Sequence, residues 1–470
     1  MTINVRALHT TRGTIDLATP QKNWTVASNV DRDSHPLILS NHYNKLYTLK
    51  QHQYHGGEIN TNYQIIAVDL WMPTNISEFK PQQLEFLCSL FEHWSDLNCV
   101  LVIGFCDESP VLHTILMDLY RLMARYSIPH SRVLFKGHNF AGQETCNDYA
   151  RHNKLPPLRY IVSWQMLSHL GEANVFDLVQ KSSDEYRRYT QLKPMSKSPR
   201  SNTFVFLNRR ETPNRIALLY ILWQKDVAKC SSMISAFPPS QPWHINERRE
   251  DYFSYKTEEA LQSLVPGEHS KTDIHKFIRS MKLGRLLPGD RDYAMIGGDE
   301  SRYAEGMTDA YVWLTCESTS ELKVTNLFFT EKVLKPMMYG QALVVFAQPG
   351  FVKAFKSLGF HTLCEEYGIS EQYDTVQDDT ERLDMIAQEI IKIGAVPLQK
   401  MHEIHLTLED KINENKKRIW LMLSNISDPD AFVWQAHNSV LSQIHGDKTY
   451  NTEQALKMYK DFFDLNKVIE

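Results

Sequence analysis

Short apolar runs alternate with longer amphipathic stretches through the first third of the chain. Runs typical of buried strands lie at 63–71, 99–105, 132–137 and 159–164. Helical spacing of apolar residues occurs near 80–96 and over 111–127. Because parallel strands need a long crossover between them, this alternation predicts a parallel sheet covered by helices on both faces. The first domain is therefore predicted to be α/β.

A break in this pattern precedes a second one of the same kind. Residues 184–202 are polar and basic and include two prolines, which is typical of a linker. Strand-like runs resume at 202–208, 310–318 and 342–347, and a helix is predicted after each of them. We therefore predict a domain boundary near 195–200, followed by a second α/β domain.

Two further regions complete the predicted organisation. Residues 237–309 are loop-rich, with isolated helical stretches, whereas long helical patterns fill 377–470. The predicted domains are an N-terminal one over 1–198, a C-terminal one over 199–425, and terminal helices over 426–470.

The composition is that of a soluble globular enzyme. Hydrophobic residues make up 42% of the 470 residues, charged residues make up 23%, and the net charge is −5. This charge argues against a surface built throughout to neutralise nucleic-acid phosphates. The N-terminus has no apolar core of signal-peptide length, and nowhere do 18 apolar residues run together. We expect a cytoplasmic protein without a membrane span.

The cysteines give no sign of a metal site. Seven of them are scattered along the chain, most within apolar runs, which indicates buried thiols in a reducing compartment. No CxxC pair or Cys/His cluster has the spacing of a zinc site. Neither a structural metal nor another resident cofactor is expected.

The turn after the strand-like run at 202–208 is the first candidate for chemistry. Open α/β sheets bind ligands where a strand's carboxyl end feeds a helix, whose free N–H groups attract anions. Asn208 ends the run, Arg209 follows it, and Arg215 lies near the helix start. A guanidinium at this place can bind a phosphate through two hydrogen bonds. The alternative interpretation is a solvated helix start rich in charge.

A second helix start carries an acid and two lysines. Thr330 is a good N-cap, which places Glu331, Lys332 and Lys335 at the beginning of the helix. The helix dipole favours Glu331 there, but it does not favour Lys332. A nucleotide diphosphate would explain both residues, because carboxylates bind ribose hydroxyls and a lysine neutralises a pyrophosphate.

Three separated blocks carry a resemblance to a known family. They read "FLNRRETPNRIALLYIL", "VWLTCESTSELKVTNLFFTEKVLKPMMYGQALVVF" and "GFHTLCEEYGISEQYDTVQDDTERLDMI". In this order they resemble the donor domain of the inverting fucosyltransferases and of their bacterial and phage relatives. The resemblance covers roughly residues 200 to 395.

The resemblance implies a GT-B architecture, with two Rossmann-like domains facing across a cleft and terminal helices packing back on them. It also implies a nucleotide-sugar donor and inversion at the anomeric carbon. Glu331 would contact the ribose, while Arg215 and Lys332 would hold the diphosphate without a metal. The chain departs from the family pattern in Leu207, which precedes Asn208 in place of serine. It departs again where Ser318 follows Glu317 in place of asparagine, so fucose is not implied as the sugar.

An inverting transferase needs a base that deprotonates the acceptor hydroxyl. In the family the base follows a strand of the N-terminal domain, and His138 stands at that place in "VLFKGHNFAGQ". A lone histidine in a loop is more often a polar surface residue. Asp107 and Glu108, at another predicted strand end, are the reserve candidates.

Other functions remain open at this point. Asp-x-Asp triplets at 31–33 and 290–292 could hold the metal of a GT-A enzyme, but neither follows a convincing strand. Basic residues crowd the linker and the turn after Asn208, and the preferred interpretation is that they attract one nucleotide diphosphate. The expected acceptor is a glycan hydroxyl. The alternatives are a hydroxymethylated phage DNA base and a nucleotide-sugar-binding protein without catalysis.

Overall fold

The computed structural model describes the chain in segments. They are 4–9, 64–70, 87–88, 91, 99–105, 113–137, 139–162, 198–208, 211–227, 232–236, 249–283, 309–317, 327–427 and 451–462. The chain folds into two compact units. Unit 1 comprises Met1–Gln180, Leu322–Phe328 and Met422–Phe462, and unit 2 comprises Lys181–Glu321, Phe329–Leu421 and Phe463–Glu470. Each unit contains one parallel sheet, so the predicted α/β class is confirmed for both halves of the chain.

The sheet of unit 1 has its five strands side by side in chain order. They are β1 (Asn4–His9), β2 (Gln64–Leu70), β3 (Cys99–Phe105), β4 (Val133–Gly137) and β5 (Arg159–Val162). Four of these strands were predicted from their apolar runs, and β1 was not. Because every connection steps in the same direction, this sheet contains no point where the strand order reverses.

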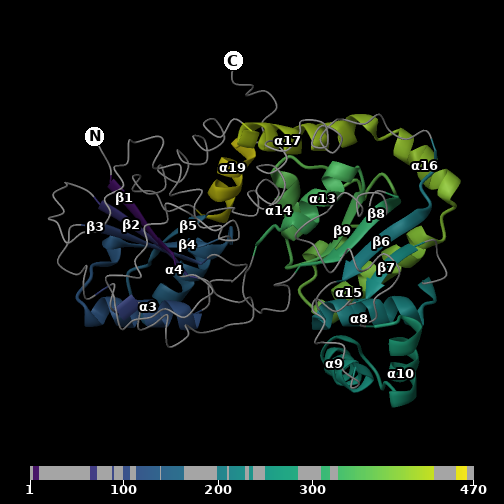
Figure 1. Ribbon diagram of the computed structural model, residues 1–470, viewed down its shortest axis with the longest axis horizontal. Coiled ribbons are helices and arrows are strands. Elements are labelled where there is room, and N and C mark those ends of the chain that lie inside the picture. Colours follow the sequence, from purple (N-terminus) through teal and green to yellow (C-terminus); the bar gives the residue numbers. More distant parts are fainter. Residues whose placement is uncertain are drawn as a thin grey trace. The chain divides into compact units, whose positions relative to one another are not determined.

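Three helices of unit 1 are described. They are α3 (His113–Arg125), α4 (Gly142–Asn153) and α19 (Thr452–Phe462), with a 3₁₀ turn η1 (His130–Arg132) before β4. Helices α3 and α4 lie on the same side of the sheet (Figure 1), as right-handed crossovers in one direction require. They pack through the stacked rings of Tyr120 and Tyr149, 5.5 Å apart. The helix predicted near 80–96 falls mostly outside the described residues.

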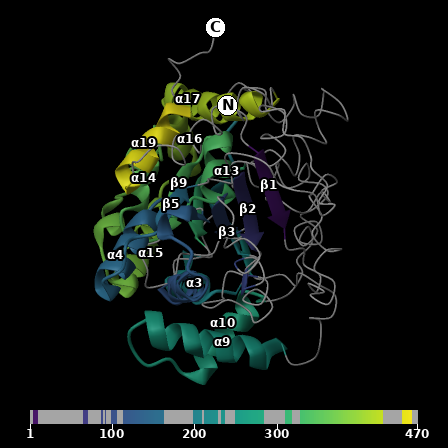
Figure 2. The ribbon, with the colours of Figure 1, turned by 90° about the vertical axis from the view of Figure 1, so that its left-hand side faces the viewer.

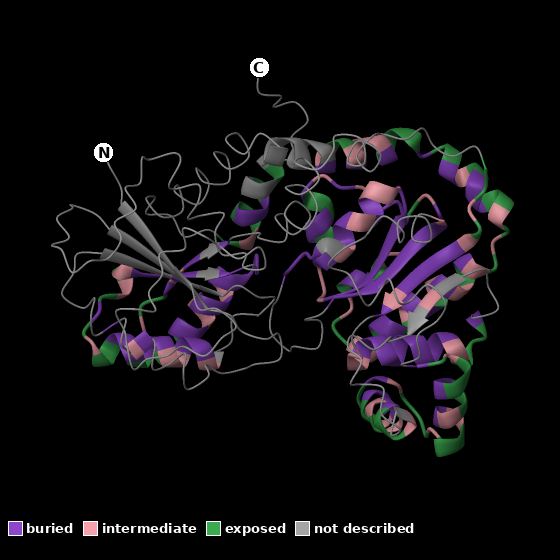
Figure 3. Cartoon of the chain, in the orientation of Figure 1, coloured by how far each residue is buried: buried purple, intermediate pink, exposed green. Residues whose placement is uncertain are grey.

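The sheet of unit 2 has the order β7-β6-β8-β9. Its strands are β6 (Asn202–Asn208), β7 (Ser232–Ala236), β8 (Ala310–Cys316) and β9 (Ala342–Phe346). Strands β6, β8 and β9 match the predicted runs and are buried (Figure 3), whereas β7 was not predicted. Burial of nearly every side chain on both faces explains why these strands show no polar alternation.

Helices cover both faces of this second sheet. On one face lie α8 (Pro213–Gln224) and α15 (Asp379–Gly394), and on the other lie α13 (Glu331–Tyr339) and α14 (Phe351–Ser357) (Figure 1). The reason is topological: the connection from β6 to β7 and that from β8 to β9 run in opposite directions across the sheet. Right-handed crossovers then place α8 and α13 on opposite faces.

A helical pair is attached to the outside of α8. Helix α9 (Arg249–Leu264) packs on α8, and α10 (Lys271–Ser280) lies beside α9 (Figure 2), where Arg279 pairs with Glu250 at 3.2 Å. The sequence indicated only isolated helical stretches here. Helix α9 does bury residues at helical spacing, namely Phe253, Thr257, Ala260, Leu261 and Leu264. Two of these are small or polar, so the apolar stripe is weak in the sequence.

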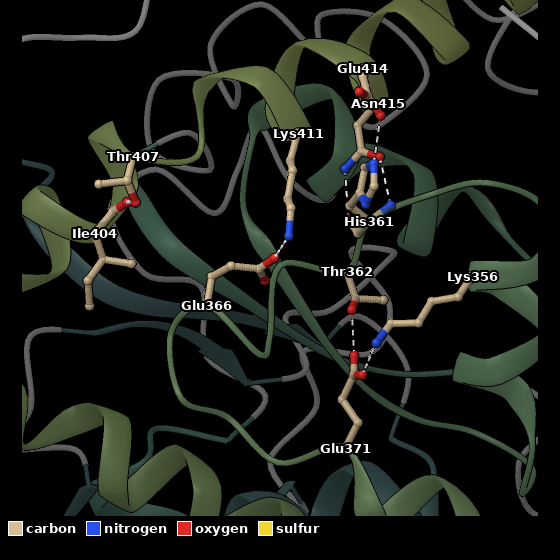
Figure 4. A network of polar contacts seen from close by, with 10 residues as sticks. All are labelled: Lys356, His361, Thr362, Glu366, Glu371, Ile404, Thr407, Lys411, Glu414 and Asn415. Carbon is tan, nitrogen blue, oxygen red and sulfur yellow. Dashed lines mark hydrogen bonds and ion pairs between the residues drawn. The ribbon is translucent and has the colours of Figure 1, made fainter.

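Two helices follow α15, and polar side chains connect them to the rest of unit 2 (Figure 4). They are α16 (Leu398–Leu406) and α17 (Glu409–Ser427), and a 3₁₀ turn η4 (Gln372–Thr375) precedes α15. Fully buried Asn415 of α17 accepts a hydrogen bond from His361 N at 2.9 Å and donates one to His361 O at 2.7 Å. This side chain therefore pairs with the backbone as a neighbouring strand would.

Candidate functional site

The strand order of unit 2 reverses between β6 and β8. From β6 the chain crosses to β7 on one side, and it later returns to β8 on the other side of β6. Open α/β sheets bind ligands at the carboxyl ends of strands at such a reversal, because the two connecting helices start on opposite faces there. In the described sheets this is the place where the topology favours a ligand.

Two predicted residues lie at this reversal. Asn208 ends β6 and is fully buried, and Arg215 is only 4% exposed in the first turn of α8. The Arg215 guanidinium donates a hydrogen bond from Nη2 to the carbonyl oxygen of Cys316, the last residue of β8, at 2.9 Å. Arg215 therefore connects the start of α8 to the end of the adjacent strand, and it brings a positive charge to this edge of the sheet.

The start of α8 contains a polar atom without a partner. Thr212 is the N-cap residue, yet its side chain makes no capping hydrogen bond, and Pro213 follows it at the first helical position. The Thr212 hydroxyl oxygen is buried and has no hydrogen-bond partner. Buried polar groups are nearly always hydrogen-bonded, so an orphaned hydroxyl at a helix N-terminus favours a ligand that completes it.

The start of α13 is capped by Thr330, as predicted. Thr330 Oγ1 accepts hydrogen bonds from the backbone N and from Nζ of Lys332, each at 3.2 Å. The same hydroxyl lies 2.9 Å from both carboxylate oxygens of Glu317, to which it donates. Glu317 directly follows β8 and is buried. Its carboxylate favours Lys332 in the first turn of the helix, where the helix dipole alone would disfavour a lysine.

Glu317 is also fixed through its backbone. Its N–H donates to the carbonyl oxygen of Phe346, the last residue of β9, at 2.9 Å, while Thr330 N lies 3.3 Å from Glu317 Oε1. The carboxylate therefore holds the beginning of α13 against the carboxyl ends of β8 and β9. Predicted Lys335 lies one turn further along α13 and is half-buried.

Several predicted site residues lie outside the described part of the chain. These are His138, Asp107, Glu108, Arg209 and Ser318. Glu331 begins α13, but its side chain is also outside the described residues. The assignment of a base and of the ribose contact therefore stays a prediction from the resemblance.

The turn between β4 and α4 is described on either side of position 138. The ring of Tyr160 lies against Gly137 and Gly142, where an added Cβ would come within 2.3 Å of its atoms. The Tyr160 hydroxyl accepts from Asn139 N at 3.1 Å. The Asn139 side chain in turn accepts from Leu327 N at 2.8 Å, within the same unit. Both glycines are thus required by close packing of the tyrosine.

Two site features were not predicted from the sequence. One is the orphaned Thr212 hydroxyl, although the Thr-Pro pair is a recognisable helix start. The other is a hydrogen bond of 2.6 Å from the Tyr252 hydroxyl in α9 to Glu211 Oε1, just before Thr212.

Within the described segments, no cluster of histidine, cysteine, aspartate and glutamate could hold a metal ion, and no helix is long and apolar enough to span a bilayer.

Comparison with known proteins gives little similarity. No protein-family model matches the chain, and no curated protein matches it in sequence. Among solved structures, it is similar to "Trehalose-6-phosphate from E. coli bound with UDP-2-fluoro glucose", with a TM-score of 0.37 and 11% identity over 79% of this chain and 74% of that chain. An apo structure of OtsA has the same TM-score and identity over 79% and 73% of the two chains. A TM-score this low assigns no fold to this chain.

Proposed function

We propose that this protein is a glycosyltransferase that takes its sugar from a nucleotide-diphosphate donor. The observation that carries the proposal is the start of α8, where a buried arginine and an orphaned hydroxyl lie three residues apart at the reversal of the strand order. The donor's diphosphate occupies this place, with Thr212 Oγ1 and Arg215 as its partners. The resemblance of three sequence blocks to the fucosyltransferase family supports the same assignment.

The chemistry follows from charge. When the bond between the anomeric carbon of the sugar and the donor's diphosphate breaks, negative charge develops on the departing nucleotide diphosphate. Arg215, Lys332 and the positive end of the α8 dipole stabilise that charge, and they need no reorganisation during the reaction. Glu317 and Thr330 keep Lys332 in place at the start of α13.

The acceptor is a glycan hydroxyl, and the reaction inverts the anomeric carbon, as in the family that the sequence resembles. A base must take the proton of that hydroxyl as it attacks. His138 is the proposed base, with Asp107 and Glu108 in reserve. The resemblance does not assign the identity of the sugar, because Leu207 and the Glu317-Ser318 pair depart from the family pattern.

Thermal melting in the presence of nucleotide sugars tests this proposal. A ligand that binds the folded chain raises the melting temperature by mass action. We expect at least one UDP-, GDP- or other nucleotide sugar to raise it in buffer containing EDTA, and Arg215→Met to remove the shift. Arg279→Met, which changes an exposed arginine on α10, is the matched control and should keep the shift. A panel in which no nucleotide sugar shifts the wild-type protein would overturn the proposal.

A further inference from the structure

A second buried arginine of unit 2 has unpaired donors. Arg382, in the first turn of α15, is only 1% exposed and is the largest fully buried side chain among the described residues. Its Nη2 pairs with Asp379, but in the described part of the chain Nε and Nη1 have no hydrogen-bond partner. Buried donors are nearly always paired, because an unpaired one destabilises the folded protein. The two unpaired N–H groups therefore favour a ligand that accepts from them.

Arg382 lies at the same edge of the sheet as Arg215. Its guanidinium carbon is 4.6 Å from the centre of the ring of Phe346, the last residue of β9. Phe346 is the register partner of Cys316 at the end of β8, whose carbonyl oxygen accepts from Arg215. Neighbouring strands are only about 4.8 Å apart, and α8 and α15 pack together on one face of the sheet (Figure 1). A group attached to a diphosphate at Arg215 can therefore reach Arg382.

The charges around Arg382 favour an uncharged acceptor over another phosphate. Burial lowers the pKa of its guanidinium, and Asp379, Asp374 and Asp378 oppose this effect. Asp374 already accepts from two backbone N–H groups at the start of α14, and Asp378 caps α15. A phosphate at Arg382 would be repelled by all three carboxylates, whereas a carbonyl oxygen would not. The charge of Arg382 is thus balanced, although its hydrogen bonds are not complete.

Arg382 and Asp379 together form a donor–acceptor pair. A guanidinium only donates and an ionised carboxylate only accepts, and the Asp379 side chain is 38% exposed, so a ligand can approach it. Uracil, thymine and guanine have a carbonyl oxygen beside a ring N–H, which matches this pair. Cytosine and adenine have the reverse pattern, an amino group beside a ring nitrogen that accepts. A site that pairs with one pattern rejects the other, because its own buried groups would stay unpaired.

We propose that Arg382 and Asp379 recognise the nucleobase of the donor and restrict it to the keto bases uracil, thymine and guanine. Arg382 donates to the carbonyl oxygen of the base, and Asp379 accepts from its ring N–H. This inference deepens the proposed function, on which it rests for the presence of a nucleotide. Binding of the diphosphate at Arg215 does not require it, so the two assignments can be tested separately.

The test is titration calorimetry of UDP, dTDP, GDP, CDP and ADP into the full-length protein. We expect the wild type to bind one of the three keto nucleotides at least about tenfold more tightly than CDP and ADP. Arg382→Met keeps an unbranched side chain but removes the donors, and it should reduce this preference about fivefold or more. Asp379→Asn changes a partly exposed side chain to one that also donates, and it should reduce the preference as well.

Asn415→Ala is the control for lost stability, because it removes buried hydrogen bonds elsewhere in unit 2, and it should keep the preference. A wild type that prefers CDP or ADP, or that binds all five nucleotides equally, would refute the base assignment and still support the diphosphate site. An unchanged preference in both variants would also refute it, because Arg382 would then have a structural role only. If Arg382→Met does not fold, Asp379→Asn alone decides between these outcomes. Absence of binding by all five nucleotides would refute the proposed function, and this inference with it.

Discussion

A buried histidine in unit 2 should make the stability of the protein depend on pH. His405 of α16 accepts a hydrogen bond at Nε2 from Arg200 Nη2, 3.3 Å away, and its Nδ1 lies 3.0 Å from the Tyr367 hydroxyl. A guanidinium can only donate, so Nε2 must be unprotonated and the imidazole neutral. Burial and the positive charge of Arg200 lower the pKa of His405 to about 3.

The sign and size of the effect follow from proton linkage. The folded-state pKa lies below the value of about 6.5 expected for histidine in the unfolded chain. The unfolded state therefore binds the extra proton, so the full stability is present above pH 6.5 and is lost as the pH falls towards 3. Between pH 7 and pH 4 the loss is about 3 kcal/mol, since each pH unit contributes about 1.4 kcal/mol.

The comparison of wild type with His405→Gln isolates the contribution of this histidine to the pH dependence of stability. Glutamine can accept from Arg200 and donate to Tyr367, but it does not titrate. We expect urea unfolding at pH 7, 6, 5 and 4 to show the wild type losing about 3 kcal/mol more than the variant over this range. Carboxylates elsewhere, such as Glu366 and Glu414, contribute equally to both proteins. Parallel stability curves for the two proteins would refute the reasoning.

Three further predictions concern single side chains. Asn415→Ala should lower the free energy of unfolding by about 2 kcal/mol, because it leaves the N–H and C=O of His361 unpaired; an unchanged urea midpoint would contradict this. Thr330→Val should cost about 2 kcal/mol, because it removes the cap of α13 and the hydrogen bond to Glu317, while Thr330→Ser retains both; equal melting temperatures for these two variants would contradict it. Thr212→Val should stabilise the ligand-free protein by about 1 kcal/mol, because it removes a buried hydroxyl without a partner, and it should weaken nucleotide-sugar binding. A Thr212→Val protein that is less stable but binds normally would speak against a ligand at this hydroxyl.

The sequence was sufficient for the interior strands of both sheets. Strands β6 and β8 are buried on both sides, so their runs are continuously apolar. The two strands that were missed, β1 and β7, are both edge strands. An edge strand has one neighbouring strand and therefore fewer apolar contacts. In β7 the two serines of "SMISA" also interrupt the apolar run.

The candidate site was predictable only in part, because its contacts join distant residues. Local signals indicated Arg215 at the start of α8 and Thr330 as an N-cap, and the structure places both at these positions. The hydrogen bond between Arg215 and Cys316 spans 101 positions and depends on β6 lying beside β8. That neighbour relation follows from the strand order, which no local pattern encodes. The bond between Tyr252 and Glu211 likewise requires α9 to pack on α8.

The most direct test of the central claim is titration calorimetry of UDP, GDP, CDP and dTDP into the wild-type protein and into Arg215→Lys, with EDTA present. If the diphosphate binds at the start of α8, one of the nucleotides binds the wild type, and the lysine variant binds it at least about tenfold more weakly. Lysine keeps the charge but loses the planar fork that matches a phosphate. Absence of binding by all four nucleotides, or equal affinity in the two proteins, would contradict the assignment of this site.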